Sequence, residues 1–155
     1  MITKRLTINA REAALHAADA EARRRGDNRV GTDHLLVALM AEPQVAAAIG
    51  VDPDQAREAL ERLDAVALDA IGVDPTLAAT SGVEDTARGR LPLTNGAKQA
   101  LRRAIRESDQ LDESAITVRH LVLAILGTEP PDPAASLLRY LNVDTTAARE
   151  SLLAL

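Results

Sequence analysis

The sequence predicts an all-α protein with about eight helices in two pseudo-symmetric four-helix repeats. Three observations support this prediction. Apolar residues recur at helical spacing, and no alternating pattern of strand length occurs in the 155 residues. The apolar content is Ala, Leu, Val and Ile, with Tyr140 as the only aromatic residue, which suits close-packed helices. A segment of the first half also recurs in the second half.

The repeat is clearest when residues 21–37 are set beside residues 107–123, 86 positions later. Residues of the same kind then coincide in the pairs Glu21/Glu107, Val30/Ile116, His34/His120, Leu35/Leu121, Ala38/Ala124 and Leu39/Ile125. Upstream the offset is 87, so one residue has been inserted or lost within the first helix. Downstream the offset is 92, so the second repeat has a longer loop around residues 127–133. The differences fall mainly in loops, as expected for a duplicated fold.

The first two helices have recognisable start and stop signals. Thr7 or Asn9 can cap a long helix that runs to about Arg25, and Gly26 ends it. The buried face of this helix is expected to be rich in alanine, which lets a neighbouring helix approach closely. Thr32 is predicted to cap a short second helix that runs through Met40.

The third and fourth helices follow after short turns. The third is expected over residues 44–49, where Gly50 ends it. Asp52 and Pro53 form a cap followed by proline at the first helical position, where the missing N–H costs nothing. The fourth helix carries apolar residues at helical spacing as far as Ile71.

The whole chain is predicted to be one domain, 1–155, with repeat one at 6–72, a linker at 73–90 and repeat two at 91–155. The helices of repeat two are expected at 94–111, 117–126, 133–141 and from 144 to the end. A single helical hairpin would expose its apolar faces, so the two repeats are expected to pack on each other around a pseudo-twofold axis.

Composition excludes several kinds of protein. There are no cysteines, which excludes disulfides and thiolate zinc sites, and we expect neither a metal nor a cofactor. A net charge of −5 argues against nucleic-acid binding, since that needs a basic surface. No stretch is apolar over about 20 residues, and no signal peptide is recognisable. We therefore expect a cytoplasmic monomer that does not bind membranes.

Two motifs, each in its expected place, resemble the ClpC-type N-terminal domain of Clp chaperone ATPases. The segment Val30-Gly31-Thr32-Asp33-His34-Leu35-Leu36 is similar to that family's Ile-Gly-Thr-Glu-His-Leu-Leu signature. The segment Leu91-Pro92-Leu93-Thr94 is similar to the opening of its second repeat. The chain departs from the family where Leu6 and Leu93 replace phenylalanine, and it has no G-x-x-x-x-G-K-[ST] phosphate loop. We expect a stand-alone domain without the AAA+ modules.

The resemblance implies a site for phosphoarginine, an anion joined to a guanidinium, at Val30, Gly31, Thr32 and Asp33. A helix start presents free amides to a phosphate, and Asp33 stands where the family has the glutamate that binds the guanidinium. The alternative is that Thr32 is only an N-cap and Asp33 only an acid in a first turn. At the equivalent place in repeat two Arg119 would repel a guanidinium, so we expect at most one such site.

The resemblance also implies a candidate groove between the repeats, near Leu6, Leu93 and Lys98, that in the family binds adaptors and peptide natural products. The recurring His34 and His120 lie 86 residues apart, and we expect them to pack or form hydrogen bonds rather than to catalyse or bind metal.

Taken together, the sequence predicts a non-catalytic module that binds proteins: a Clp ATPase, its adaptors, substrates or phosphoarginine-marked chains. No nucleophilic elbow or paired catalytic acids are recognisable. Two alternatives stay open: a helical regulatory or nucleic-acid-binding protein, and a relic that folds but has lost its ligand.

Overall fold

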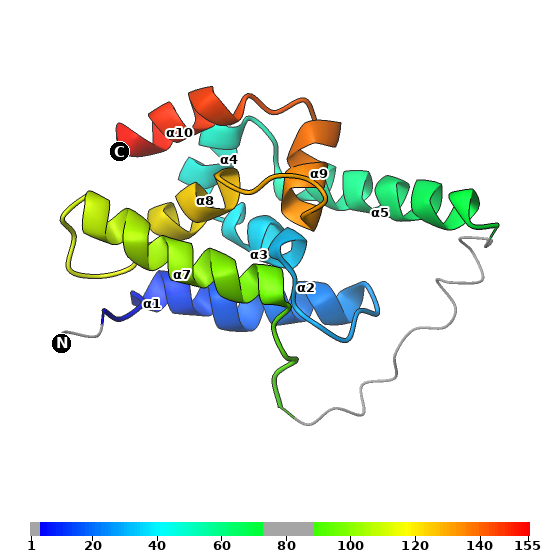
Figure 1. Cartoon of the computed structure of the whole chain (residues 1–155), viewed down its shortest axis with the longest axis horizontal. Helices are drawn as coiled ribbons and strands as arrows, with labels where there is room; N and C mark the ends of the chain where they lie inside the picture. Colours follow the sequence, from blue (N-terminus) through cyan, green and yellow to red (C-terminus); the bar gives the residue numbers. More distant parts are fainter. Residues whose placement is uncertain (1–3, 73–88) are drawn as a thin grey trace.

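The computed structural model describes residues 4–72 and 89–155 and confirms the predicted all-α fold (Figure 1). The predicted linker, 73–90, lies almost wholly outside the described residues. Repeat one consists of α1 Ile8–Arg11, η1 Glu12–Ala17, α2 Ala18–Arg24, α3 Thr32–Leu39, α4 Pro43–Ile49 and α5 Pro53–Ala70. Repeat two consists of α7 Asn95–Gln110, α8 Val118–Leu126, α9 Pro133–Tyr140 and α10 Thr145–Leu153. Since α1, η1 and α2 form one continuous helix, each repeat has four helices in its described part.

The two repeats are joined by two short parallel bridges between residues that correspond in the duplication. Leu6 pairs with Ile116, and Val30 pairs with Leu93. The backbone hydrogen bonds repeat in the same order: Thr7 N donates to Ile116 O (3.0 Å), and Thr94 N donates to Val30 O (2.9 Å). Each bridge therefore ties the start of one repeat's first helix to the segment before the other repeat's second helix, as pseudo-twofold packing requires.

The first helix of repeat one has one residue more than that of repeat two, and a π-helical segment accommodates it. The η1 segment, Glu12–Ala17, interrupts the first helix, whereas α7 is α-helical throughout. A π turn accommodates one extra residue without breaking the helix. The offset of 87 before this segment and 86 after it thus has a structural cause. Because of η1, the buried alanines on both sides of it, among them Ala10 and Ala22, face the core together.

The second helix of each repeat forms the centre of the core. Every residue of α3 is buried, and so are the seven residues from His120 to the end of α8. A helix that is apolar nearly all round is stable only when other helices surround it. In Figure 1, α3 and α8 lie inside the molecule, between the first helices of the two repeats and the group formed by α4, α9 and α10.

A pair of equivalent ion pairs ties the first helix of each repeat to its last. Arg57 Nε on α5 donates to Glu21 Oε1 at 2.9 Å, and Arg149 Nη2 on α10 donates to Glu107 Oε2 at 2.9 Å. The coincidence of Glu21 with Glu107 in the sequence therefore reflects one contact formed twice.

Two details differ from simple expectation. The N-cap of α3 is Gly31 rather than Thr32, which is the first helical residue, and the Gly31 amide donates to His34 Nδ1. The apolar spacing of α5 also continues beyond its buried part: Val66 is 65% exposed and Ile71 is 74% exposed. Figure 1 shows the reason, since the second half of α5 extends past the rest of the described chain.

The role of η1 leads to a test by deletion. Removing the exposed His16 should convert η1 into α-helix with the register of α7, so the free energy of unfolding should change by less than about 1 kcal/mol. Removing the exposed Arg102 from α7, which has no π segment, should rotate the buried Ala104 and Ser108 off the core and cost about 3 kcal/mol or more. Urea unfolding followed by circular dichroism measures both, and equal losses of stability would contradict this account.

Candidate functional site

The predicted site residues come together at the N-terminus of α3, and all four are buried. Val30 lies in the bridge to Leu93, and Thr32 is fully buried at the first helical position. Gly31 separates them in an extended conformation. The segment is therefore assembled as expected, but its side chains already have partners within the chain.

The Asp33 carboxylate pairs with a guanidinium of the protein itself. Arg25, the C-cap of α2, donates from Nη1 to Asp33 Oδ2 at 2.9 Å, and the same guanidinium pairs with Asp64 of α5. Burial disfavours a charged arginine, but these carboxylates outweigh it, so the pKa of Arg25 is raised. A side chain at Gly31 would place its Cβ 2.7 Å from Asp33 Oδ1, so glycine leaves room for this arrangement.

The Thr32 hydroxyl is bound by the other repeat. Thr32 Oγ1 donates to Asp132 Oδ2 at 2.8 Å and accepts from the Ala134 amide at 3.2 Å. Asp132 is the N-cap of α9 and also accepts from the amides of Ala134 and Ala135. A carboxylate thus lies beside the N-terminus of α3, where the dipole of the helix favours a negative charge.

His34 and His120 form the same cap in both repeats, which confirms the hydrogen-bonding role expected for them. Gly31 N donates to His34 Nδ1 and Thr117 N donates to His120 Nδ1, each at 2.8 Å. The proton of each neutral ring is therefore on Nε2. In repeat one His34 Nε2 donates to Asp27 Oδ2 at 2.7 Å. Burial would raise the pKa of Asp27, but this hydrogen bond and the charge of Arg25 outweigh it and lower the pKa.

The corresponding contact is missing in repeat two. His120 is fully buried, and its Nε2 has no hydrogen-bond partner in the described part of the chain. Glu113 Oε2 lies 3.3 Å from it, but the Glu113 carboxylate is paired with Arg119. Burial, with the positive charges of Arg119 and Lys4, lowers the pKa of His120 and keeps the ring neutral. A buried donor without an acceptor costs about 1–3 kcal/mol.

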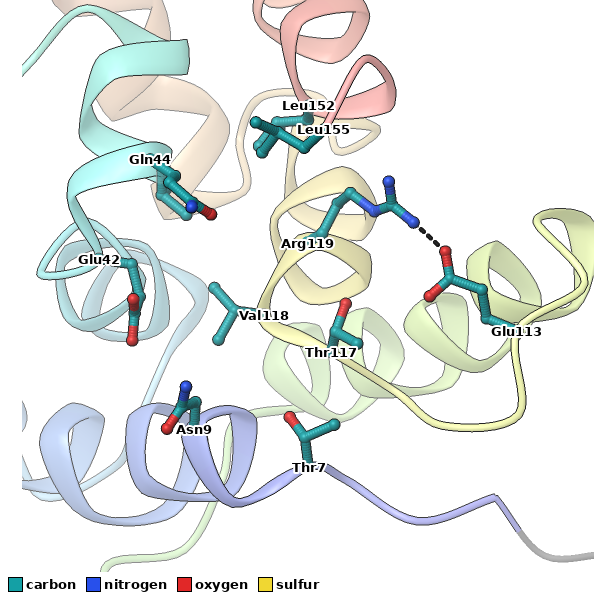
Figure 2. A pocket seen from close by; sticks show the side chains of 11 residues that line it. Thr7, Asn9, Glu42, Gln44, Glu113, Thr117, Val118, Arg119, Leu152 and Leu155 are labelled. Carbon is teal, nitrogen blue, oxygen red and sulfur yellow. Dashed lines mark hydrogen bonds and ion pairs between the residues drawn. The ribbon is translucent and has the colours of Figure 1, made fainter.

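Beside the N-terminus of α8 lies a hollow of about 420 Å³ (Figure 2). It is lined from α1, α4, α8 and α10 and the segments beside them, by Thr7, Asn9, Glu42, Gln44, Val45, Glu113, Thr117, Val118, Arg119, Leu152 and Leu155. Figure 2 shows Arg119 and Glu113 on one side of Val118, with Glu42 and Gln44 on the other. We call this hollow the α8 groove.

The residues of the candidate groove between the repeats lie elsewhere. Leu6 and Leu93 are half-buried against the core in the two different bridges, and Lys98 is exposed on α7. None of the three lines the α8 groove or the second hollow, which is polar and lies between α2 and α5. Ligand binding by these residues stays a prediction.

Two further properties concern only residues 4–72 and 89–155. They contain no cluster of three or more His, Asp or Glu side chains arranged to bind a metal ion. No helix among them is both long and apolar enough to cross a lipid bilayer.

Sequence reasoning missed Arg25, Asp132 and Glu113 as partners of the signature residues. For Arg25 the only signal was a cation eight residues before Asp33, which by itself does not predict an ion pair. For Asp132 the only signal was its place before Pro133, which predicts a cap and says nothing of Thr32, 100 residues away.

Comparison with known proteins extends the likeness over most of the chain. Residues 5–141 match the model of the Clp repeat (R) N-terminal domain family. A probable Clp protease ATP-binding subunit of Chlamydia pneumoniae is 29% identical over 150 residues, which are 94% of this chain and 16% of that protein. A ClpA homologue of Guillardia theta is 30% identical over 143 residues, 89% of this chain and 15% of that one. The chain thus spans about 16% of the length of the curated relatives it matches.

The fold has a solved counterpart. The N-terminal domain of the chaperone ClpD from Arabidopsis thaliana superposes with a TM-score of 0.72 at 23% identity, over 99% of this chain and 96% of that domain. With the duplicated bridges, the paired histidine caps and the family match over residues 5–141, the conclusion is that this chain belongs to the Clp repeat N-terminal domain family.

Proposed function

We propose that the chain is a non-catalytic module that binds proteins, either a Clp ATPase, its adaptors or its substrates, and thereby modulates Clp-dependent proteolysis. The observation that carries this proposal is the position of the match: the chain aligns with an N-terminal-domain family and with about 16% of the Clp ATP-binding subunits. The shared segment is one that in those subunits is joined to other parts of the protein.

The chemistry of the described residues supports binding rather than catalysis. Both repeated histidines use Nδ1 to cap a helix, so neither is positioned as a general base toward a hollow. Asp33 and Glu113 pair with arginines. Hollows such as the α8 groove are suited to recognition.

Phosphoarginine binding at the N-terminus of α3 is part of this proposal, but the ligand would have to displace groups of the chain itself. The Asp132 carboxylate lies where the phosphate would come, and the Arg25 guanidinium lies against Asp33, where the ligand's guanidinium would come. A ligand must displace both groups, so its affinity in the unaltered protein should be weak.

This leads to a prediction with three variants. Free phosphoarginine should bind at a single site by calorimetry, and Asp33→Arg should abolish binding because it replaces the acid beside Gly31 with a cation that repels the ligand's guanidinium. Asp132→Asn should tighten binding by about fivefold, since it removes a competing charge while asparagine still caps α9. The pseudo-equivalent Glu42→Gln is the matched control.

Two equivalent sites, unchanged binding by Asp33→Arg, or weaker binding by Asp132→Asn would contradict the prediction.

The proposed modulation can be measured directly. The chain is added in excess to a purified Clp ATPase and protease from the same organism, and degradation of an unfolded substrate is followed by fluorescence. We expect the rate to change at least about twofold, upward if the chain delivers substrate and downward if it competes for it. A pulldown from the native cytosol, with Asp33→Arg as control, identifies the partner. An unchanged degradation rate together with recovery of DNA would favour the alternative of a helical nucleic-acid-binding protein.

A further inference from the structure

The two signature segments differ in charge, and the one at the start of α8 borders a hollow. In repeat one the cation, Arg25, is the C-cap of α2, and the acid, Asp33, lies in the first turn of α3. The equivalents in repeat two are Leu111 and Arg119, so there the cation belongs to α8 itself. At the N-terminus of α3, Thr32 and Asp132 close the approach. Their counterparts beside α8 are Val118, which has no hydroxyl, and Glu42, whose carboxylate has no hydrogen bond or ion pair within the described residues.

Glu113 has two neighbouring donors and is paired with only one of them. Arg119 pairs with it, and the fully buried His120 Nε2 lies 3.3 Å from it without forming a hydrogen bond. In repeat one the same histidine nitrogen does have its carboxylate, Asp27, at 2.7 Å. The Arg119 pair therefore leaves a buried donor unpaired, and a second carboxylate on Arg119 would free Glu113 to accept from His120.

Resting on the proposed function, we propose that the α8 groove binds the C-terminal residue of a partner chain, with its free carboxylate on Arg119 and an apolar side chain on the floor. A carboxylate matches the planar fork of a guanidinium with two parallel hydrogen bonds. The floor is apolar, because Val45 and Leu152 are buried and line it beside Val118. The carboxylate and the apolar side chain of one C-terminal residue suit a groove that presents a cation and this floor together.

The other groups of the groove fit the rest of such a ligand. Glu42, across the groove from Arg119 in Figure 2, can accept the backbone N–H groups that precede the last residue. Asn9 and Gln44 supply amides that donate and accept. A volume of about 420 Å³ has room for a few residues and is too small for a folded element. Arg119 is 22% exposed and Glu113 32%, so solvent reaches both partners of the pair that must open.

The test uses the whole chain and two probes that differ in one group: acetyl-Ala-Ala-Leu with a free carboxylate and the same peptide as a C-terminal amide. Calorimetry or NMR titration should detect the acid and find the amide at least about tenfold weaker. Arg119→Gln should abolish binding of the acid. Glu113→Gln should tighten it several-fold, because it releases Arg119 and leaves an amide oxygen for His120. Arg102→Gln, an exposed arginine of α7, is the matched control.

A spectroscopic readout separates this mechanism from simple charge attraction. On binding of the acid peptide, the Nε2 proton of His120 should gain an acceptor, so its exchange with water should slow and its ¹⁵N resonance should shift. The shift should be absent with the amide peptide and in Arg119→Gln. Circular dichroism melts of each variant establish that it is folded.

Several outcomes would overturn the inference: equal binding of acid and amide, normal binding by Arg119→Gln, or weaker binding by Glu113→Gln. Binding of free phosphoarginine in this groove instead of the acid peptide would also overturn it. If the acid peptide does not bind while the chain still changes the rate of Clp-dependent degradation, the proposed ligand of the α8 groove is wrong and the proposed function stands. If the degradation rate is unchanged as well, the proposed function fails with it.

Discussion

The fold depends on the two bridges that cross between the repeats. Only four backbone hydrogen bonds make them, from 2.9 to 3.0 Å, yet each bridge lies directly before a helix that must start at a fixed place. Leu6 and Leu93 precede the long first helices, and Ile116 and Val30 precede the buried second helices. Because the partners lie in different repeats, neither repeat can place its central helix without the other. The symmetry of the duplication is therefore required for the core to close.

Much of this fold could be predicted from the sequence, because the signals are local or repeated. Gly50 ends α4 in the left-handed conformation, and Asp52 caps α5 with Gln55 as reciprocal partner, as their residue types predict. The one-residue change of offset in the first helix also marked a structural feature, the π segment η1. The sequence could not predict where along α5 the buried part ends, because that depends on how far the neighbouring helices extend. The exposed Val66 therefore could not be told apart from a buried residue of the same helix.

The candidate site was predictable in place but not in its internal contacts. The signature residues lie at the N-terminus of α3 as expected, yet the partner of Thr32 is 100 residues distant, and Asp64, which shares Arg25 with Asp33, comes from another helix. Such contacts depend on tertiary packing, which spacing along the chain does not report. The two histidines were an exception, because a cap from the third helical residue is local and was repeated at the equivalent position.

The differences between the repeats form a consistent set. Repeat one has Gly31 before Asp33, and a Cβ at Gly31 would lie 2.7 Å from the Asp33 carboxylate. Repeat two has Thr117 at the place of the glycine, and there the side chain of Arg119 pairs with Glu113 instead. Thr32 accompanies Asp132, and Val118 leaves Glu42 without such a partner. Each of these differences changes which residues the neighbouring side chains can contact. The N-termini of α3 and α8 therefore have different surroundings, although they are equivalent in the duplication. One N-terminus is closed by a carboxylate and a guanidinium of the chain itself, and the other has an arginine at a hollow, where a different anion can compete for it.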